Sequence, residues 1–270
     1  MTDQDPPDVD AVVLDVDGTV LRGEQAIPGA PAAVRWFRDA GLDCLFVTNN
    51  PTRPPTAFAE RLSAAGVPAT PDDVLTSGEM TAEYLARDHP DRPTFVVGED
   101  GLREQLRAHD VVLTGRWDAA EVVVASVDRE FTYDDLTEAF WALEDDDVAF
   151  VATDPDLVVP GGERDVPGSG AIVGAVANVA GRDPEAVLGK PSPGARAVIL
   201  DRIGVPPERC LVVGDRLDTD VALGADAGMT TALVLSGVTG RQDVAASDHR
   251  PDFVADSLAA IPEILGLGDA

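Results

Sequence analysis

Carboxylates at the end of an apolar run are the first side chains in this sequence that could do chemistry. Asp15 and Asp17 close the run AVVLDVDGTV, directly before a Gly-Thr turn. The D-x-D spacing is weak by itself, because it occurs six times among 35 aspartates. Only this copy ends an apolar strand pattern on a tight turn, which predicts two carboxylates at the edge where parallel α/β sheets bind ligands. A solvated turn is the alternative for this stretch alone.

Polar groups also end two further apolar runs. CLFVTNN ends in Thr48, Asn49 and Asn50, whose neutral donors suit phosphate oxygens. CLVVGDRLDTD places Asp215 directly after a strand pattern, and Asp220 follows closely. A helix cap is the alternative for the first group, and a solvated helical turn is the alternative for Asp220. Together with the first run, these segments predict one crevice at the carboxyl ends of the strands.

The segment AVLGKPSPG holds the only lysine of the chain. The 20 basic residues are 19 arginines and Lys190, which stands at the mouth of a predicted helix. A surface lysine is one interpretation. The other is a site that requires a compact ammonium group, because the planar fork of arginine occupies a different space.

Short β-branched runs alternate with helical patterns along the chain. Strands are predicted at residues 11–15, 44–49, 94–98, 111–114, 121–127, 148–153, 210–215, 231–235 and 252–256. Helices are predicted at residues 29–41, 54–66, 81–90, 132–147, 169–181, 192–204 and 218–228. Strands this apolar need cover on both faces, which favours parallel βαβ units and the α/β fold class.

Six motifs in order carry a family resemblance over nearly the whole chain. They are DVDGTVLRGEQAIPGA, TNNPTR, ATDPDLVVP, GSGAIVGAV, GKPSPGA and GDRLDTDVALGADAGM. The sequence resembles the haloacid dehalogenase superfamily, in particular its class IIA capped phosphatases, which are nitrophenylphosphatase-like and ribonucleotide-monophosphatase-like. This resemblance implies a doubly wound, Rossmann-like core over 1–76 and 186–270, with an α/β cap domain inserted at 77–185.

The resemblance also implies roles for the acidic residues. Asp15 would be the nucleophile that forms an aspartyl-phosphate. Asp17 would be the general acid for the leaving alcohol and then the general base for water. Mg²⁺ would bind Asp15, the backbone carbonyl of Asp17 and Asp215. Asp220 would orient this metal shell without binding the ion directly.

Phosphate binding is implied for the remaining motif residues. Thr48, Asn49 and Asn50 would bind the phosphoryl oxygens, and Lys190 would neutralise charge on the nucleophile and the phosphate. Four carboxylates around a phosphate need a compact cation, which accounts for one lysine in a chain that otherwise uses arginine. The motif ATDPD departs from the family, because Asp154 stands where the family usually has Asn.

The composition limits the partners of the chain. Its formal charge is −29, with 49 acidic and 20 basic residues, which argues against nucleic acid and anionic membrane surfaces. Diffuse acidity with almost no lysine is typical of proteins from halophilic archaea. Cys44 and Cys210 lie in apolar runs; a disulfide is the alternative, but two buried free thiols are expected. With no signal peptide visible and no apolar run long enough to span a membrane, a cytoplasmic location is expected.

The resemblance implies a Mg²⁺-dependent phosphomonoester hydrolase that acts on a small phosphorylated metabolite. Two other functions would use the same residues. A phosphotransferase or phosphomutase of the same fold would use the same aspartyl-phosphate, and a phospho-accepting signalling protein would use an acidic pocket, a threonine and a lysine without turnover. The substrate stays open among nitrophenyl phosphate, phosphoglycolate, glycerol phosphate and nucleoside monophosphates. A homo-oligomer through the cap also stays open. His89, His109 and His249 lie in polar segments without ligand spacing and are expected on the surface.

Overall fold

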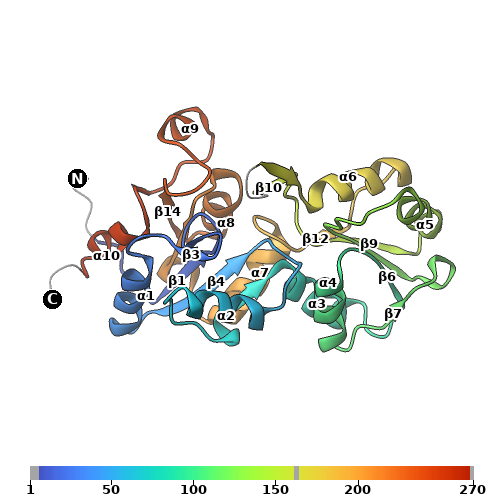
Figure 1. Cartoon of the computed structure of the whole chain (residues 1–270), viewed down its shortest axis with the longest axis horizontal. Coiled ribbons are helices and arrows are strands. Elements are labelled where there is room, and N and C mark those ends of the chain that lie inside the picture. Colours follow the sequence, from blue (N-terminus) through green and yellow to red (C-terminus); the bar gives the residue numbers. More distant parts are fainter. Residues whose placement is uncertain (1–5, 161–163, 268–270) are drawn as a thin grey trace. The chain divides into compact units, whose positions relative to one another are not determined.

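The computed structural model describes residues 6–160 and 164–267 (Figure 1). The chain divides into two compact units. Unit 1 comprises Met1–Thr48, Thr56–Leu75 and Arg196–Ala270. Unit 2 comprises Asn49–Pro55 and Thr76–Ala195, so it contains the whole segment 77–185 that is predicted as a cap.

Unit 1 is built on a sheet of six strands in the order β15-β14-β13-β1-β4-β5. These strands are β1 (Ala11–Asp15), β4 (Asp43–Thr48), β5 (Val74–Thr76), β13 (Cys210–Gly214), β14 (Thr230–Val234) and β15 (Phe253–Ala255). β1 pairs in parallel with β13 and β4, and Ala11 lies opposite both Cys210 and Asp43. Because this register aligns the starts of the three central strands, their carboxyl ends also meet at one edge.

Helices bury apolar stripes against this sheet. They are α1 (Ala30–Asp39), α2 (Pro55–Ala64), α7 (Pro193–Ile203), α8 (Ala222–Ala227) and α10 (Ile261–Ile264). The short α9 (Arg241–Ala246) also belongs to this unit, but none of its residues is buried. In α1 the buried residues Ala30, Ala33, Val34 and Phe37 recur at the spacing of one helical face. A short hairpin of β2 (Leu21–Arg22) and β3 (Gln25–Ala26) follows β1.

Unit 2 has its own sheet of five strands in the order β12-β9-β8-β6-β7, with parallel pairing throughout. The strands are β6 (Thr94–Val97), β7 (Leu113–Thr114), β8 (Val122–Ala125), β9 (Ala149–Ala152) and β12 (Ala186–Val187). The helices are α3 (Ser77–Asp88), α4 (Asp100–Ala108), α5 (Tyr133–Leu143) and α6 (Ser169–Ala180), and β10 (Val158–Pro160) pairs with β11 (Asp165–Pro167). In Figure 1, α3 and α4 lie on one side of this sheet, and α5 and α6 lie on the other.

The predicted α/β class is confirmed, since both large sheets are parallel and flanked by helices. All nine predicted strands form. The sequence patterns missed α4, whose run DGLREQLRA is dominated by polar residues, and the short helices α9 and α10. They also missed the two- and three-residue strands β2, β3, β5 and β10–β12. Cys44 and Cys210 are buried free thiols, as predicted. Within the described part of the chain, no helix has the length and apolar character that crossing a bilayer requires.

Candidate active site

Three aspartates of unit 1 converge where the central strands end. Asp15 is the last residue of β1, and Asp215 and Asp220 follow β13. One carboxylate oxygen from each of the three lies within 4.8 Å of the others. Asp215 and Asp220 are almost completely buried, and Asp15 is partly buried. The structure therefore brings together Asp15 and Asp215, which the sequence predicts at one sheet edge, and it places the carboxylate of Asp220 beside them.

Glycines make room for the Asp215 carboxylate. A Cβ atom on Gly237 would stand 1.8 Å from Asp215 Oδ2, and one on Gly18 would stand 2.4 Å from the same oxygen. Gly18 also has φ of +94°, a backbone conformation that favours glycine. The backbone N–H of Val238 donates to Asp215 Oδ2 at 2.6 Å. Close backbone contact on several sides therefore fixes the direction in which Asp215 points.

The Asp220 carboxylate lies directly against the end of β13. A Cβ atom on Gly214 would stand 2.1 Å from the carboxyl carbon of Asp220, so glycine is required there. The backbone N–H of Arg216 donates to Asp220 Oδ2 at 3.1 Å. Asp218, by contrast, is exposed and pairs with Arg216 at 3.3 Å. Of the two acids after Asp215, only Asp220 thus belongs to the cluster.

The donor set of this cluster fits a hard divalent cation. Asp15, Asp215 and Asp220 offer only carboxylate oxygens, which are the ligands that Mg²⁺ prefers. Three carboxylates at this distance also repel one another unless a positive charge lies among them. The residues present are therefore compatible with a magnesium site.

Asp17 is held by an arginine that the sequence patterns did not single out. Arg61, on α2, donates from Nη2 to Asp17 Oδ1 at 2.6 Å and from Nη1 to Oδ2 at 3.4 Å. The Arg61 side chain is only 11% exposed, whereas that of Asp17 is 40% exposed. Arg61 also donates to the carbonyl of Gly23. The ion pair fixes the position of Asp17. The sequence patterns could not predict this pair, because the two residues are 44 positions apart.

Thr48 is the last residue of β4 and is 4% exposed. β4 is the direct neighbour of β1, and Asp15 lies opposite Val47 in their register. Thr48 and Asp15 therefore end adjacent strands at the same edge of the sheet. The predicted placement of this threonine beside the first aspartate is consistent with that register.

In unit 2, Asn49 holds the main chain of Lys190. The backbone N–H of Lys190 donates to Asn49 Oδ1 at 2.8 Å, and Asn49 Nδ2 donates to the Lys190 carbonyl at 3.0 Å. Lys190 is buried, at 3% exposure. It is therefore not the surface lysine of the alternative interpretation. The Asn49 amide is used to position Lys190, a function that differs from the phosphoryl contact expected from the resemblance.

Asn50 shapes the turn that follows. Its Oδ1 accepts hydrogen bonds from Thr52 N at 2.9 Å and from Thr52 Oγ1 at 2.7 Å. This pattern is an Asx turn, in which a side chain replaces a backbone carbonyl. The structure thus gives the Asn50 carbonyl oxygen a local role in the backbone of unit 2.

Asp154 is a buried acid next to the Lys190 segment. It is 1% exposed, and a Cβ atom on Gly189 would stand 2.5 Å from the Asp154 Cβ. Thr153 Oγ1 lies 3.0 Å from Asp154 Oδ2, and the backbone N–H of Asp156 donates to Oδ1 at 3.2 Å. Burial, with a smaller contribution from the charge of Asp156, raises the pKa of Asp154 to about 7. The departure from the family motif therefore places a titratable group against the Lys190 segment.

The expectation that the histidines lie on the surface is only partly correct. His249 is exposed. The side chain of His89 is 10% exposed, with Nε2 2.9 Å from Glu185 Oε1. His109 is partly buried and lies beside two glutamates. The helix that positions His109 was missed in the sequence, and its environment was missed with it.

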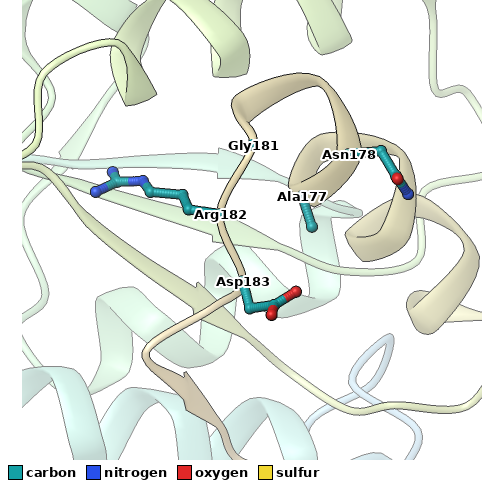
Figure 2. A pocket seen from close by; sticks show the side chains of 5 residues that line it. All are labelled: Ala177, Asn178, Gly181, Arg182 and Asp183. Carbon is teal, nitrogen blue, oxygen red and sulfur yellow. The ribbon is translucent and has the colours of Figure 1, made fainter.

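A hollow at the C-terminal end of α6 is lined by Ala177, Asn178, Gly181, Arg182 and Asp183 (Figure 2). Figure 2 shows the Arg182 guanidinium directed away from the other lining side chains, and it donates to the backbone carbonyls of residues 146 and 148. Asn178 Nδ2 donates to the Gly174 carbonyl at 2.6 Å. These polar groups support the local backbone, so the hollow offers no assembled catalytic set.

Comparisons with known proteins agree with the motifs. Residues 12–112 match a model described as haloacid dehalogenase-like hydrolase, and residues 187–261 match a HAD-hydrolase-like model. Chronophin from Rattus norvegicus is 38% identical over 272 residues, which cover 94% of this chain and 87% of chronophin. The chain belongs to the haloacid dehalogenase-like hydrolase family. Within this family it is an enzyme of the phosphatase group, close to the class IIA proteins.

Two more family members align with nearly the full length of this chain. 5'-Nucleotidase YutF from Bacillus subtilis is 32% identical over 246 residues, which cover 91% of this chain and 94% of YutF. The structure of p-nitrophenyl phosphatase from Archaeoglobus fulgidus superimposes with a TM-score of 0.90 at 34% identity, covering 95% of this chain and 99% of that one. The family fold is thus Rossmann-like α/β, as predicted.

Proposed function

We propose that this phosphatase hydrolyses small phosphate monoesters with Mg²⁺, through a phosphoryl group carried on Asp15. The convergence of Asp15, Asp215 and Asp220 within 4.8 Å is the observation that carries this proposal. Bound Mg²⁺ would offset the negative charge of these carboxylates and of the phosphoryl oxygens. Asp215, held by glycines and a backbone N–H group, would hold the ion together with Asp15 and the carbonyl of Asp17. Asp220 lies beside these residues and would orient the shell.

In the first half-reaction a carboxylate oxygen of Asp15 attacks phosphorus, and the bond from phosphorus to the ester oxygen breaks. Asp17 gives a proton to the departing alcohol. Asp15 stands at the end of a strand buried on both faces, so its backbone is fixed, while the residue as a whole is only partly buried. Arg61 holds the side chain of Asp17 in place, only two residues from the nucleophile.

In the second half-reaction water attacks the phosphorus of the aspartyl-phosphate. Asp17 takes a proton from this water, the bond from the Asp15 oxygen to phosphorus breaks, and inorganic phosphate leaves. The free carboxylate of Asp15 is restored, so no other reactant is consumed. This step separates the proposal from a signalling protein that keeps its phosphoryl group.

For Thr48, Asn50 and Lys190 we propose contact with the phosphoryl oxygens, on the strength of the family motifs. The burial of Lys190 supports a specific use of its ammonium group, because a buried lysine needs a compensating charge or hydrogen bond. We assign Asn49 mainly to the position of Lys190, since both polar ends of its amide bond that residue's main chain.

The substrate we propose is a small phosphorylated metabolite, with unit 2 acting as the cap that selects the leaving group. The names of the relatives support this class, since they include a 5'-nucleotidase and a p-nitrophenyl phosphatase. The net charge of −29 supports a small ester over nucleic acid or an anionic membrane as partner. A cytoplasmic location, adaptation to high salt and a homo-oligomer through the cap are further proposals.

The experiment measures phosphate release from nitrophenyl phosphate and a panel of natural esters in high KCl. We expect activity with Mg²⁺, none with excess chelator, and a loss of roughly 10⁴-fold or more in Asp15→Asn, which lacks the nucleophile. Asp218→Asn is the matched control, because Asp218 is exposed and outside the cluster. Full activity in chelator would remove Mg²⁺ from the account, and transfer of phosphate to an alcohol without release would favour a phosphotransferase.

A further inference from the structure

Helices α3 and α4 of unit 2 are fixed against each other by a buried glutamine. Gln105 of α4 is 3% exposed, and its Nε2 donates to the carbonyls of Pro51 at 2.7 Å and Gly101 at 2.9 Å. The hydroxyl of Thr76, which caps α3, donates to Gln105 Oε1. A Cβ atom on Gly78 would stand 2.6 Å from Gln105 Nε2. The first turn of α3 therefore has one defined position relative to α4.

One turn beyond Gln105, three side chains that can bind a metal meet. Glu79 and Glu83 lie four residues apart on α3, so they share one helical face. His109 caps the C-terminus of α4. One ligand atom of each lies within 4.8 Å of the others, and all three residues are partly buried. This cluster lies entirely in unit 2 and shares no residue with the aspartate cluster of unit 1.

The imidazole of His109 is oriented for binding a metal. Its Nδ1 lies 3.0 Å from the backbone carbonyl of Gln105. A carbonyl only accepts hydrogen bonds, so Nδ1 carries the hydrogen and the lone pair of the neutral ring is on Nε2. A hydrogen bond from the second nitrogen to a carbonyl is the usual support of a histidine that binds metal. The same glutamine thus fixes both the two helices and the ring.

We propose that Glu79, Glu83 and His109 form a site for a divalent transition-metal ion of the Zn²⁺ type. Two carboxylates and one imidazole, completed by water, match the ligand types and number of such sites. From the usual zinc–ligand lengths, ligand atoms around a tetrahedral zinc ion stand about 3.4 Å apart, so small side-chain movements would close the cluster on an ion. The nitrogen ligand distinguishes this site from the all-oxygen aspartate cluster.

The competing explanation is a simple ion pair between protonated His109 and the glutamates. An ion pair of this kind needs no metal. On this explanation the three residues bind no metal even when the histidine is neutral. The two explanations therefore differ when the imidazole is neutral, because the Nε2 lone pair is then available to a metal.

The test uses the full-length chain with Asp15→Asn and Asp215→Asn, which weaken the aspartate cluster as a competing site. Zn²⁺ is titrated by calorimetry and Co²⁺ by its visible absorption, at pH 8 in high potassium salt. We expect one equivalent of each metal to bind, cobalt bands typical of a nitrogen-containing site, and a higher thermal midpoint with Zn²⁺.

Adding His109→Gln should weaken binding at least tenfold and remove the cobalt bands, and Glu83→Gln should weaken binding too. His249→Gln is the matched control, because His249 is exposed and outside the cluster. Circular dichroism checks that each variant folds, and Glu83→Gln serves as the test if His109→Gln does not. Absence of metal binding in the background protein, or equal binding with and without the cluster substitutions, would overturn the proposal.

Discussion

The aspartate cluster of unit 1 and the lysine segment of unit 2 place their charges by different means. Asp15 and Asp215 take their positions from the ends of parallel strands whose register brings them to one edge. Lys190 lies in a loop after a two-residue strand and is held through its own main chain by Asn49, 141 residues earlier. Regular structure positions the anionic groups, whereas one long-range amide contact positions the cation.

This difference predicts how each region responds to substitution. At a strand end the backbone is fixed independently of the side chain, so replacing an aspartate should remove its chemistry and leave the fold intact. In the lysine segment, geometry depends on a few specific contacts, so a conservative replacement should already be costly. The predictions below test this contrast, beginning with the largest effect.

Lys190→Arg keeps the positive charge but changes the shape of the group that carries it. This substitution should lower kcat by on the order of 10²-fold. Phosphoryl transfer depends on cations in fixed positions, and a planar guanidinium spreads its charge over a larger group of different shape than a compact ammonium. Steady-state kinetics with Mg²⁺ measures the loss, and a thermal midpoint close to wild type shows that the fold survives. Arg241→Lys is the reverse exchange at an exposed ion pair and should be silent. Near-normal turnover of Lys190→Arg would mean that the lysine position does not matter.

Asp154→Asn should stabilise the protein at alkaline pH. The pKa of Asp154 is about 7 in the folded chain and 3.8 without the protein environment, so the folded state retains a proton between these values that the unfolded state releases. Stability attributable to this group therefore falls as pH rises from about 4 to about 7 and is constant above. A difference of about three pH units corresponds to about 4 kcal/mol.

Chemical denaturation at pH 4.5 and pH 8.5 measures this effect. The variant should gain up to about 4 kcal/mol over wild type at the higher pH and much less at the lower one. Asp183→Asn, at an exposed position of the same unit, is the control. Equal gains at both pH values would show that Asp154 does not titrate in this range.

Arg61→Gln should have the smallest effect, a fall in kcat of about tenfold with KM little changed. The substitution removes the ion pair that fixes Asp17, while the acid itself and the phosphate-binding groups remain. Arg61→Lys should recover part of the loss, because it restores the charge without the two-point contact. Arg35→Gln on an exposed helix face is the control. If Arg61→Gln raises KM and leaves kcat unchanged, Arg61 acts on substrate binding instead.

The same contrast explains which site residues could be predicted from the sequence and which could not. Asp15, Thr48 and Asp215 were found because each follows an apolar strand pattern, and strand ends meet in any parallel sheet. The contacts from Arg61 to Asp17 and from Asn49 to Lys190 join residues that are 44 and 141 positions apart, which no local pattern contains.

The missed elements have equally physical causes. β12 is only two residues long, so its strand pattern is too short to detect before Lys190. The polar sequence of α4 hides a helix whose position depends on the buried amide of Gln105. Without that helix, His109 has no visible neighbours and was expected on the surface. The role of Gly237 beside Asp215 depends on an approach between distant loops.

The central claim is that Asp15 carries the phosphoryl group during turnover. The most direct measurement is a rapid acid quench of the enzyme during hydrolysis of nitrophenyl phosphate with Mg²⁺, followed by peptide mass spectrometry. We predict one phosphoryl group on the peptide that contains Asp15, sensitive to hydroxylamine as an acyl phosphate and absent from Asp15→Asn. Active enzyme with no such adduct at any quench time, or with the phosphoryl group on another residue, would contradict the account.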